Sequence, residues 1–193
     1  VDYKVINRKA WKSYSAPGDM KTRGICGSGI LDVVGELFLA GIVAKSGAFS
    51  PKGRESHRFR RNKETGFAEF VLAWAEETSI GKDIVITQKD IRQIQMAKAS
   101  IYTGCKLMMR RMGIKTLDSI KIAGAFGTHV DRHLARVIGL IPDCSLDTVT
   151  SVGNAAGDGC RAALLNREKR KEADQLCHKV TYMELTLEEN FQG

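Results

Sequence analysis

The stretch LDSIKIAGAFGTHVDRHLARVIGLIP, residues 117 to 142, carries the clearest indication of the fold. Residues 117–123 have the pattern of a short β-strand, which runs through a Gly-Ala-Phe-Gly turn into a helix. Gly124 and Gly127 lack a Cβ, so the backbone there can come close to whatever lies at the carboxyl end of the strand. Ligands of open α/β sheets bind at that edge. The stretch therefore predicts an α/β protein with a candidate ligand site beside these glycines.

A second strand–glycine–helix unit follows. DTVTSV (147–152) has the pattern of a strand, and GNAAGDGCRAALLN (153–166) is a glycine-marked helix start whose small residues favour close packing. GICGSGILDVVGEL (24–37) places three glycines before an amphipathic helix. A helix start of this kind can hold a phosphate on its free N–H groups, or it can serve only as a tight turn. The repetition strengthens the interpretation as a nucleotide-binding protein.

The longest predicted helix spans 88–112. Thr87 and Asp90 resemble a capping box at its start, and Gly113 ends it. Its apolar positions predict a buried stripe, made of Ile91, Ile94, Ala97, Ile101, Cys105 and Met108. An amide, a cation and a phenol lie together on a neighbouring face, from Gln95, Lys98 and Tyr102. This spacing fits either a ligand-binding face or a solvated one.

The other strand candidates are 67–75 and 83–87, which we expect to form a hairpin, and 178–185. The chain has 193 residues, of which 43% are hydrophobic and 7% aromatic. That composition is typical of an α/β protein with one core, or of one lobe of a larger domain. No apolar run approaches the length of a membrane span, so we expect no membrane association.

The formal net charge of +8 is concentrated at 51–66 and 166–174. We expect the first segment to be an exposed basic loop, in which Arg60 and Arg61 steer association with an acidic protein partner. Acidic residues interrupt the second segment, as on a solvated helix face. Neither segment carries a nucleic-acid-binding motif or interleaved aromatic residues, so we expect no nucleic-acid partner.

Metal binding is not expected in this chain. The five cysteines are scattered without a CxxC pair, which is typical of reduced cytoplasmic thiols, and an iron–sulfur cluster needs four clustered thiolates. His129 and His133 can share a helix face, but no third ligand accompanies them.

Taken together, GICGSGILD, DIRQIQMAKASIYTG, IKIAGAFG with LARVIGLIPD, and VGNAAGDGCRAALL resemble the carboxyl-terminal part of the ATP-dependent reductive activators of corrinoid proteins. The resemblance covers nearly the whole chain. It implies one lobe of an actin-like, ribonuclease H-like ATPase fold, with a mixed sheet, flanking helices and an inserted helical and hairpin subdomain at about 24–82. The iron–sulfur domain and the first ATPase lobe are then expected outside residues 1–193, in agreement with a chain that begins at Val1.

The resemblance also implies a function. In that family, ATP and Mg²⁺ drive delivery of an electron from an iron–sulfur cluster to cob(II)alamin, which restores cob(I)alamin on the corrinoid protein of a methyltransferase system. The nucleotide-binding residues implied here are Gln95, Lys98, Tyr102, Gly124, Ala125, Phe126 and Gly127. A connecting segment at the lobe hinge is implied for Gly153, Asn154 and Gly157.

The chain departs from the wider superfamily in lacking both phosphate loops of the DxGT type and their metal-orienting carboxylates. No catalytic residue is therefore expected here, and we expect the chain alone to be inactive as an ATPase. For Gly24, Gly27, Ser28 and Gly29 the resemblance favours a turn and partner surface over a phosphate site. Two alternatives stay open: the activator ATPase of a 2-hydroxyacyl-CoA dehydratase system, and a non-enzymatic interaction module.

Overall fold

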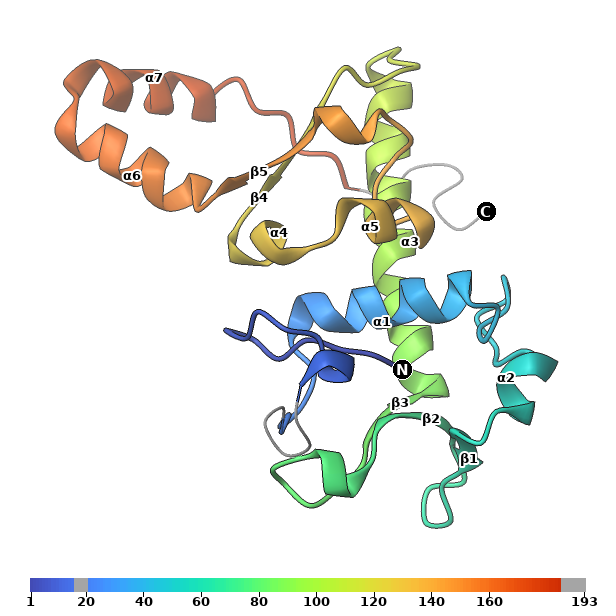
Figure 1. Ribbon diagram of the computed structural model, residues 1–193. Helices are drawn as coiled ribbons and strands as arrows, with labels where there is room; N and C mark the ends of the chain where they lie inside the picture. Colours follow the sequence, from blue (N-terminus) through green and yellow to red (C-terminus); the bar gives the residue numbers. More distant parts are fainter. Residues whose placement is uncertain (16–20, 185–193) are drawn as a thin grey trace. The chain divides into compact units, whose positions relative to one another are not determined.

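The helix predicted from the capping box forms as α3, Gln88–Arg111. The backbone N–H of Thr87 donates to Asp90 Oδ2 at 2.8 Å, and the N–H of Asp90 donates to Thr87 Oγ1 at 3.1 Å. Gly113, with φ at +67°, follows the helix and ends it as predicted. The computed structural model describes residues 1–15 and 21–184 and divides the chain into two units, Val1–Ala97 and Lys98–Gly193 (Figure 1).

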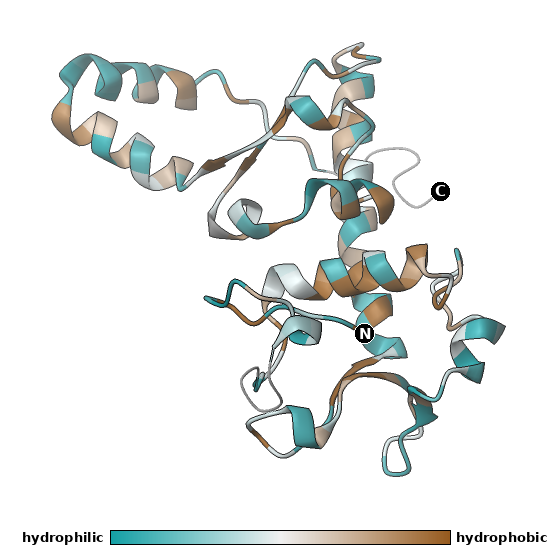
Figure 2. Cartoon of the chain, viewed as in Figure 1, coloured by the Kyte–Doolittle hydropathy of each residue, from teal (hydrophilic) through white to brown (hydrophobic). Residues whose placement is uncertain are grey.

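The first unit is built on a three-stranded antiparallel sheet of order β1-β2-β3: Phe59–Arg61, Ala68–Ala73 and Ile84–Thr87. The predicted hairpin is β2 and β3, with Phe70 opposite Ile86. Two helices accompany the sheet, α1 (Gly27–Leu39) and α2 (Pro51–Glu55), together with 3-10 turns at Lys12–Tyr14 and Ala75–Glu77. Figure 2 shows hydrophobic residues along β2 and α1.

The core of the first unit joins these elements through apolar side chains that are almost fully buried. Phe49 stacks on Phe70 with ring centroids 6.4 Å apart and meets Phe59 edge-on at 5.4 Å. The other core residues include Leu31, Val34, Leu37, Val43, Val71, Ile86 and Ile91.

The segment 51–66 is largely exposed, as we expected, but it forms a helix and a strand in place of the predicted loop. Ser50 caps α2 by accepting the N–H of Gly53, Pro51 takes the first helical position, and β1 follows. Arg58 donates to the carbonyl oxygens of Val71 and Leu72, so part of the basic charge is used inside the fold. The prediction failed because these partners lie more than ten residues away along the chain, where a local charge pattern gives no indication of them.

The second unit contains a parallel pair of strands, β4 (Ile120–Ala123) and β5 (Val149–Gly153). Its core lies around Ala135, Ile141 and Val149, against which Ile120, Ile122, Val130, Leu140 and Cys144 pack. The remaining helices are α4 (Ala125–His129), α5 (Arg132–Val137), α6 (Ala155–Leu165) and α7 (Arg167–Cys177), with a 3-10 turn at Leu146–Thr148.

Three further expectations need correction. The single helix after Gly124 is divided into α4 and α5, because Asp131 caps α5 by accepting the N–H of Leu134 at 2.9 Å. Residues 178–184 form no strand, and residue 185 lies outside the described part. On α3, Ile91 is buried as predicted, but Ile101 and Met108 are each 50% exposed. Helical periodicity identifies a common face but not how much of its length is covered.

No helix among the described residues is long and apolar enough to cross a bilayer.

Candidate nucleotide site

The two strand–glycine–helix units meet at the carboxyl edge of the parallel pair. Ala123 lies opposite Gly153 in the register of β4 and β5, and the backbone N–H of Gly124 donates to the carbonyl oxygen of Gly153 at 2.6 Å. Helix α4 begins immediately after Gly124, and α6 begins two residues after Gly153. Both predicted glycine turns therefore lie at one sheet edge, the place where open α/β sheets bind ligands.

Backbone geometry explains why both positions hold glycine. Gly124 has φ +94° and ψ 163°, a region that is almost exclusive to glycine, and Gly153 has φ +64°. A Cβ built on either residue would meet no other atom within 4 Å. The protein thus leaves open space beside both turns, where a flat ligand can pack directly against the backbone.

The residues of the Gly-Ala-Phe-Gly turn have different surroundings. Gly127 is buried, and a Cβ there would collide with the side chain of Ile122, so this glycine allows α4 to pack on β4. Phe126 is 51% exposed, which leaves its ring free to contact a bound molecule. Ala125 is the first residue of α4.

The connecting segment is held by a helix cap. Asn154 Oδ1 accepts the N–H of Gly157 at 3.0 Å at the start of α6, and a Cβ on Gly157 would run into the Asn154 amide. The cap satisfies one of the free N–H groups of this helix end. Asn154 and Gly157 therefore act together in capping α6, which begins two residues after Gly153.

Residues Lys98 and Tyr102 lie one turn apart on α3, both half-buried. The Lys98 ammonium lies at the turn after α5, where a Cβ on Gly139 would be 3.4 Å from Nζ. Lys106 Nζ lies 5.3 Å from the centre of the Tyr102 ring. Lys98 and Tyr102 are thus half-buried side chains of α3, and their part in binding a ligand stays a prediction.

Gln95 has different partners. Its Oε1 accepts a hydrogen bond from Arg92 Nη1 at 2.8 Å, and its amide fills the space that a side chain on Gly47 would need. Arg92 in turn donates to the carbonyl oxygen of Ser46 at 2.7 Å. Gln95 thus supports the 44–48 turn of the first unit, and a ligand could use its amide only by competing with Arg92.

The glycine turn at 24–29 caps α1 through a thiol. Cys26 Sγ accepts the N–H of Gly29 at 3.3 Å and lies 3.5 Å from Ser28 Oγ. The hydrogen bond with Ser28, followed by that with Gly29, lowers the pKa of the exposed Cys26 thiol. Gly24 has open space around it, and Gly27 begins the helix. One of the N–H groups needed for a phosphate is therefore already occupied.

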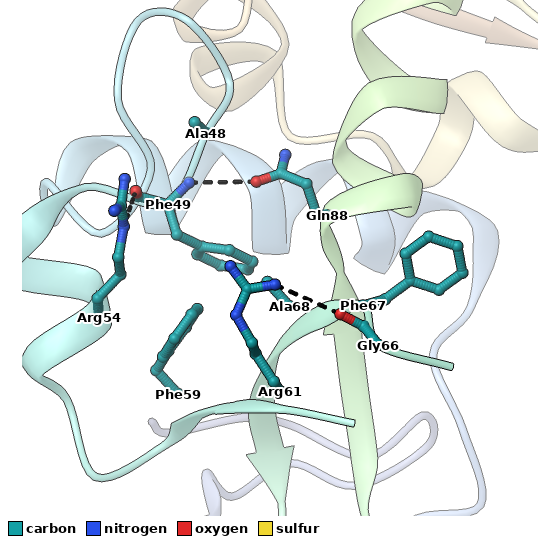
Figure 3. Close-up of a pocket in the computed structure, with 9 residues that line it drawn as sticks. All are labelled: Ala48, Phe49, Arg54, Phe59, Arg61, Gly66, Phe67, Ala68 and Gln88. Carbon is teal, nitrogen blue, oxygen red and sulfur yellow. Dashed lines mark hydrogen bonds between the residues drawn. The ribbon is translucent and has the colours of Figure 1, made fainter. Parts of the chain in front are cut away.

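The first unit also holds a pocket that we did not predict from the sequence. Phenylalanine and arginine side chains enclose a pocket in the first unit, lined by Ala48, Phe49, Arg54, Phe59, Arg61, Gly66, Phe67, Ala68 and Gln88 (Figure 3). The alternation of Phe59 and Arg61, which places both on one face of a strand, was the available indication.

Among the described residues, no three His, Cys, Asp or Glu side chains gather in a way that could hold a metal ion.

Comparison with known proteins places this geometry in a family. Residues 1–193 match the family described as the C-terminal domain of RACo, the ASKHA domain. The corrinoid activation enzyme RamQ of Eubacterium limosum is 40% identical over 185 residues, which cover 93% of this chain and 31% of that protein. A solved structure of a reductive activator for corrinoid, iron–sulfur protein matches with a TM-score of 0.78 and 39% identity, over 88% of this chain and 27% of that one.

The chain therefore spans only 31% and 27% of the length of these two relatives. The α/β elements described above agree with the actin-like fold expected from the sequence. The match over every residue, together with two relatives near 40% identity, shows that this chain belongs to the family of C-terminal ASKHA domains of RACo.

Proposed function

We propose that this chain is the nucleotide-binding lobe of an ATP-dependent reductive activator of corrinoid proteins. The observation that carries the proposal is the pairing of Gly124 with Gly153 at one sheet edge, with open space beside both residues. This feature lies in a chain whose relatives are named for corrinoid activation and for reductive activation of a corrinoid, iron–sulfur protein.

The residues present fit the adenosine part of ATP. Bare backbone at Gly124 and Gly153 admits a flat ring system without a steric clash, and the exposed ring of Phe126 can stack on it. Lys98 and Tyr102 contribute a cation and a hydroxyl on α3. Bound with Mg²⁺, ATP supplies a phosphoanhydride whose hydrolysis can drive a conformational cycle. Phosphate handling is assigned to residues outside this chain, because the sequence holds no DxGT-type loop.

The proposed reaction transfers one electron. A reduced iron–sulfur cluster elsewhere in the full protein loses the electron and is oxidised, while cob(II)alamin on the corrinoid protein of a methyltransferase system gains it and becomes cob(I)alamin. This lobe contributes the nucleotide-dependent change of shape that favours the transfer-competent arrangement. We assign the reaction to the cytoplasm, where the five cysteines stay reduced.

The test uses the full-length protein, a chemically reduced cluster and a corrinoid protein in the cob(II)alamin state. Absorbance spectra follow the formation of cob(I)alamin with ATP and Mg²⁺, with ADP, and without nucleotide. The proposal requires that cob(I)alamin accumulates only with ATP. Equal accumulation under all three conditions would contradict it, and activation of a 2-hydroxyacyl-CoA dehydratase in place of the corrinoid protein would favour the alternative.

A further inference from the structure

We propose that the pocket between α2, β1 and β2 is a docking site for an acidic segment of the protein partner. This segment inserts one apolar or aromatic side chain between the guanidinium groups of Arg54 and Arg61. The inference rests on the proposed function only for the identity of the partner, the corrinoid protein. Nothing in the nucleotide site uses these residues.

Phe49 and Phe59 lie close together at the base of the pocket, and Phe67 lies farther away, beside Gly66 (Figure 3). Phe49 is 2% exposed and Phe59 is half-buried against it, whereas Phe67 is 48% exposed. The cavity has a volume of about 310 Å³, at the lower end of the range for ligand pockets. Such a space accepts a side chain more readily than a large cofactor.

Two side chains of the lining, Gln88 and Arg54, are held in place by hydrogen bonds within the protein. Gln88 accepts the N–H of Phe49 at 3.3 Å and donates to the carbonyl oxygen of Gly47 at 2.7 Å, so both ends of its amide are used. Arg54 Nε donates to the carbonyl oxygen of Phe49 at 3.0 Å. A preformed pocket loses little side-chain entropy on binding, which favours affinity.

The charged side chains that line the pocket are all positive. Its lining holds two guanidiniums and no carboxylate. Among the described residues, neither Arg54 nor Arg61 has an acidic side chain within 4 Å, and Arg61 makes only a long hydrogen bond to the carbonyl oxygen of Gly66, at 3.4 Å. The neighbouring Arg60, by contrast, pairs with both Glu69 and Asp83 at 2.6 Å. In the lining of the pocket, Arg54 and Arg61 thus keep N–H donors for a partner.

This combination indicates an acidic protein segment. Guanidinium groups bind carboxylates through paired hydrogen bonds, and aromatic and arginine side chains dominate the energetic centres of protein interfaces. A formal charge of +8 on the chain also attracts an acidic surface from a distance. The occupant is therefore a segment of the corrinoid protein that carries Asp or Glu beside an apolar residue.

The experiment compares two double variants of the full-length protein that lose the same charge. One is Arg54→Gln with Arg61→Gln, and the control is Arg8→Gln with Arg167→Gln, two exposed arginines outside the pocket. Initial rates of cob(I)alamin formation are measured against the concentration of the corrinoid protein. We expect KM for the corrinoid protein to rise about tenfold in the pocket variant, which corresponds to about 1.4 kcal/mol, with kcat unchanged and less than a twofold change in the control.

A second arm separates this inference from the proposed function. A peptide that carries fluorescein on its amino terminus, fluoresceinyl-Asp-Glu-Phe-Asp-Glu-amide, is titrated with each variant and followed by fluorescence anisotropy, whether or not the protein acts on the corrinoid protein. Tighter binding to the parent and the control than to the pocket variant supports the docking site even if corrinoid reduction is absent. Equal peptide binding by all three proteins, or an equal rise of KM in both double variants, would overturn it.

Discussion

The backbone N–H of Gly124 donates to the carbonyl oxygen of Gly153 at 2.6 Å, and both glycines have positive φ. This hydrogen bond extends the β4–β5 ladder by one residue beyond the end of β4, and a helix begins shortly after each glycine. It links the two glycine motifs, which lie 29 residues apart in the sequence, at one edge. The geometry of either turn therefore constrains the other.

The first prediction concerns this turn. Gly124→Ala should lower the free energy of unfolding by about 1–3 kcal/mol, because alanine is strained at φ +94° and ψ 163°. The matched control is Gly159→Ala in the interior of α6, where an added Cβ meets open space and should stabilise by about 0.5–1 kcal/mol. Chemical denaturation of both variants measures the difference. Destabilisation of the same size in both would show that backbone strain is not the cause.

The second prediction tests the contact between α4 and β4. Gly127→Ala should cost about 1–3 kcal/mol, because the added methyl collides with the side chain of Ile122. In a background of Ile122→Ala the shortest of these contacts, with Ile122 Cγ2, is absent, so the two changes together should destabilise by less than the sum of their separate effects. A double-mutant cycle from denaturation curves gives the coupling. Strict additivity would argue against this packing.

The third prediction separates Arg60 from the docking arginines. The Glu69 side chain is only 4% exposed and depends on Arg60 Nε at 2.6 Å, with Asn62 Nδ2 at 3.3 Å as its other partner. Arg60→Met should therefore destabilise the fold by about 3 kcal/mol, since it leaves a buried carboxylate without its cation. Adding Glu69→Gln should recover part of that loss. Thermal unfolding measures both, and a melting temperature unaffected by Arg60→Met would contradict the buried pair.

The fourth prediction concerns Cys26. The hydrogen bonds from Ser28 and Gly29 stabilise its thiolate and lower its pKa, so the thiol should react with iodoacetamide at lower pH than an ordinary cysteine. Removing the larger contribution in Ser28→Ala should raise the pKa and move the pH midpoint of alkylation upward. Mass spectrometry of the peptide that contains Cys26 follows the reaction. An unchanged midpoint would show that Ser28 does not interact with the sulfur in solution.

Elements determined by local patterns were predictable from the sequence. The capping box of Thr87 and Asp90 located the start of α3, and alternating apolar residues located β2 and β3. The glycine turns at Gly124 and Gly153 were recognised in the same way, because only glycine tolerates their backbone angles. The family match then confirmed the fold.

Features that depend on distant partners were not predictable. Arg60 pairs with Asp83, which lies 23 residues away in the sequence. Because the local sequence gives no sign of this partner, we predicted Arg60 to be part of an exposed basic loop. Gln95 shares a helix face with Lys98 in the sequence pattern, yet its amide is used by Arg92 and the Gly47 turn. The aromatic pocket joins Phe49, Phe59 and Phe67, which no single periodicity connects.

Titration calorimetry decides whether ATP binds at the edge formed by Gly124 and Gly153, as we propose. The full-length parent, Gly124→Val and Gly113→Val are titrated with ATP and Mg²⁺ after circular dichroism has shown each to be folded. Gly113 also has positive φ and open space around a Cβ, but it lies in the turn after α3. We predict that Gly124→Val loses roughly 2 kcal/mol or more of binding free energy, about a thirtyfold rise in Kd, whereas Gly113→Val binds ATP like the parent. Equal affinity in a folded Gly124→Val variant would contradict the placement of the nucleotide on this lobe.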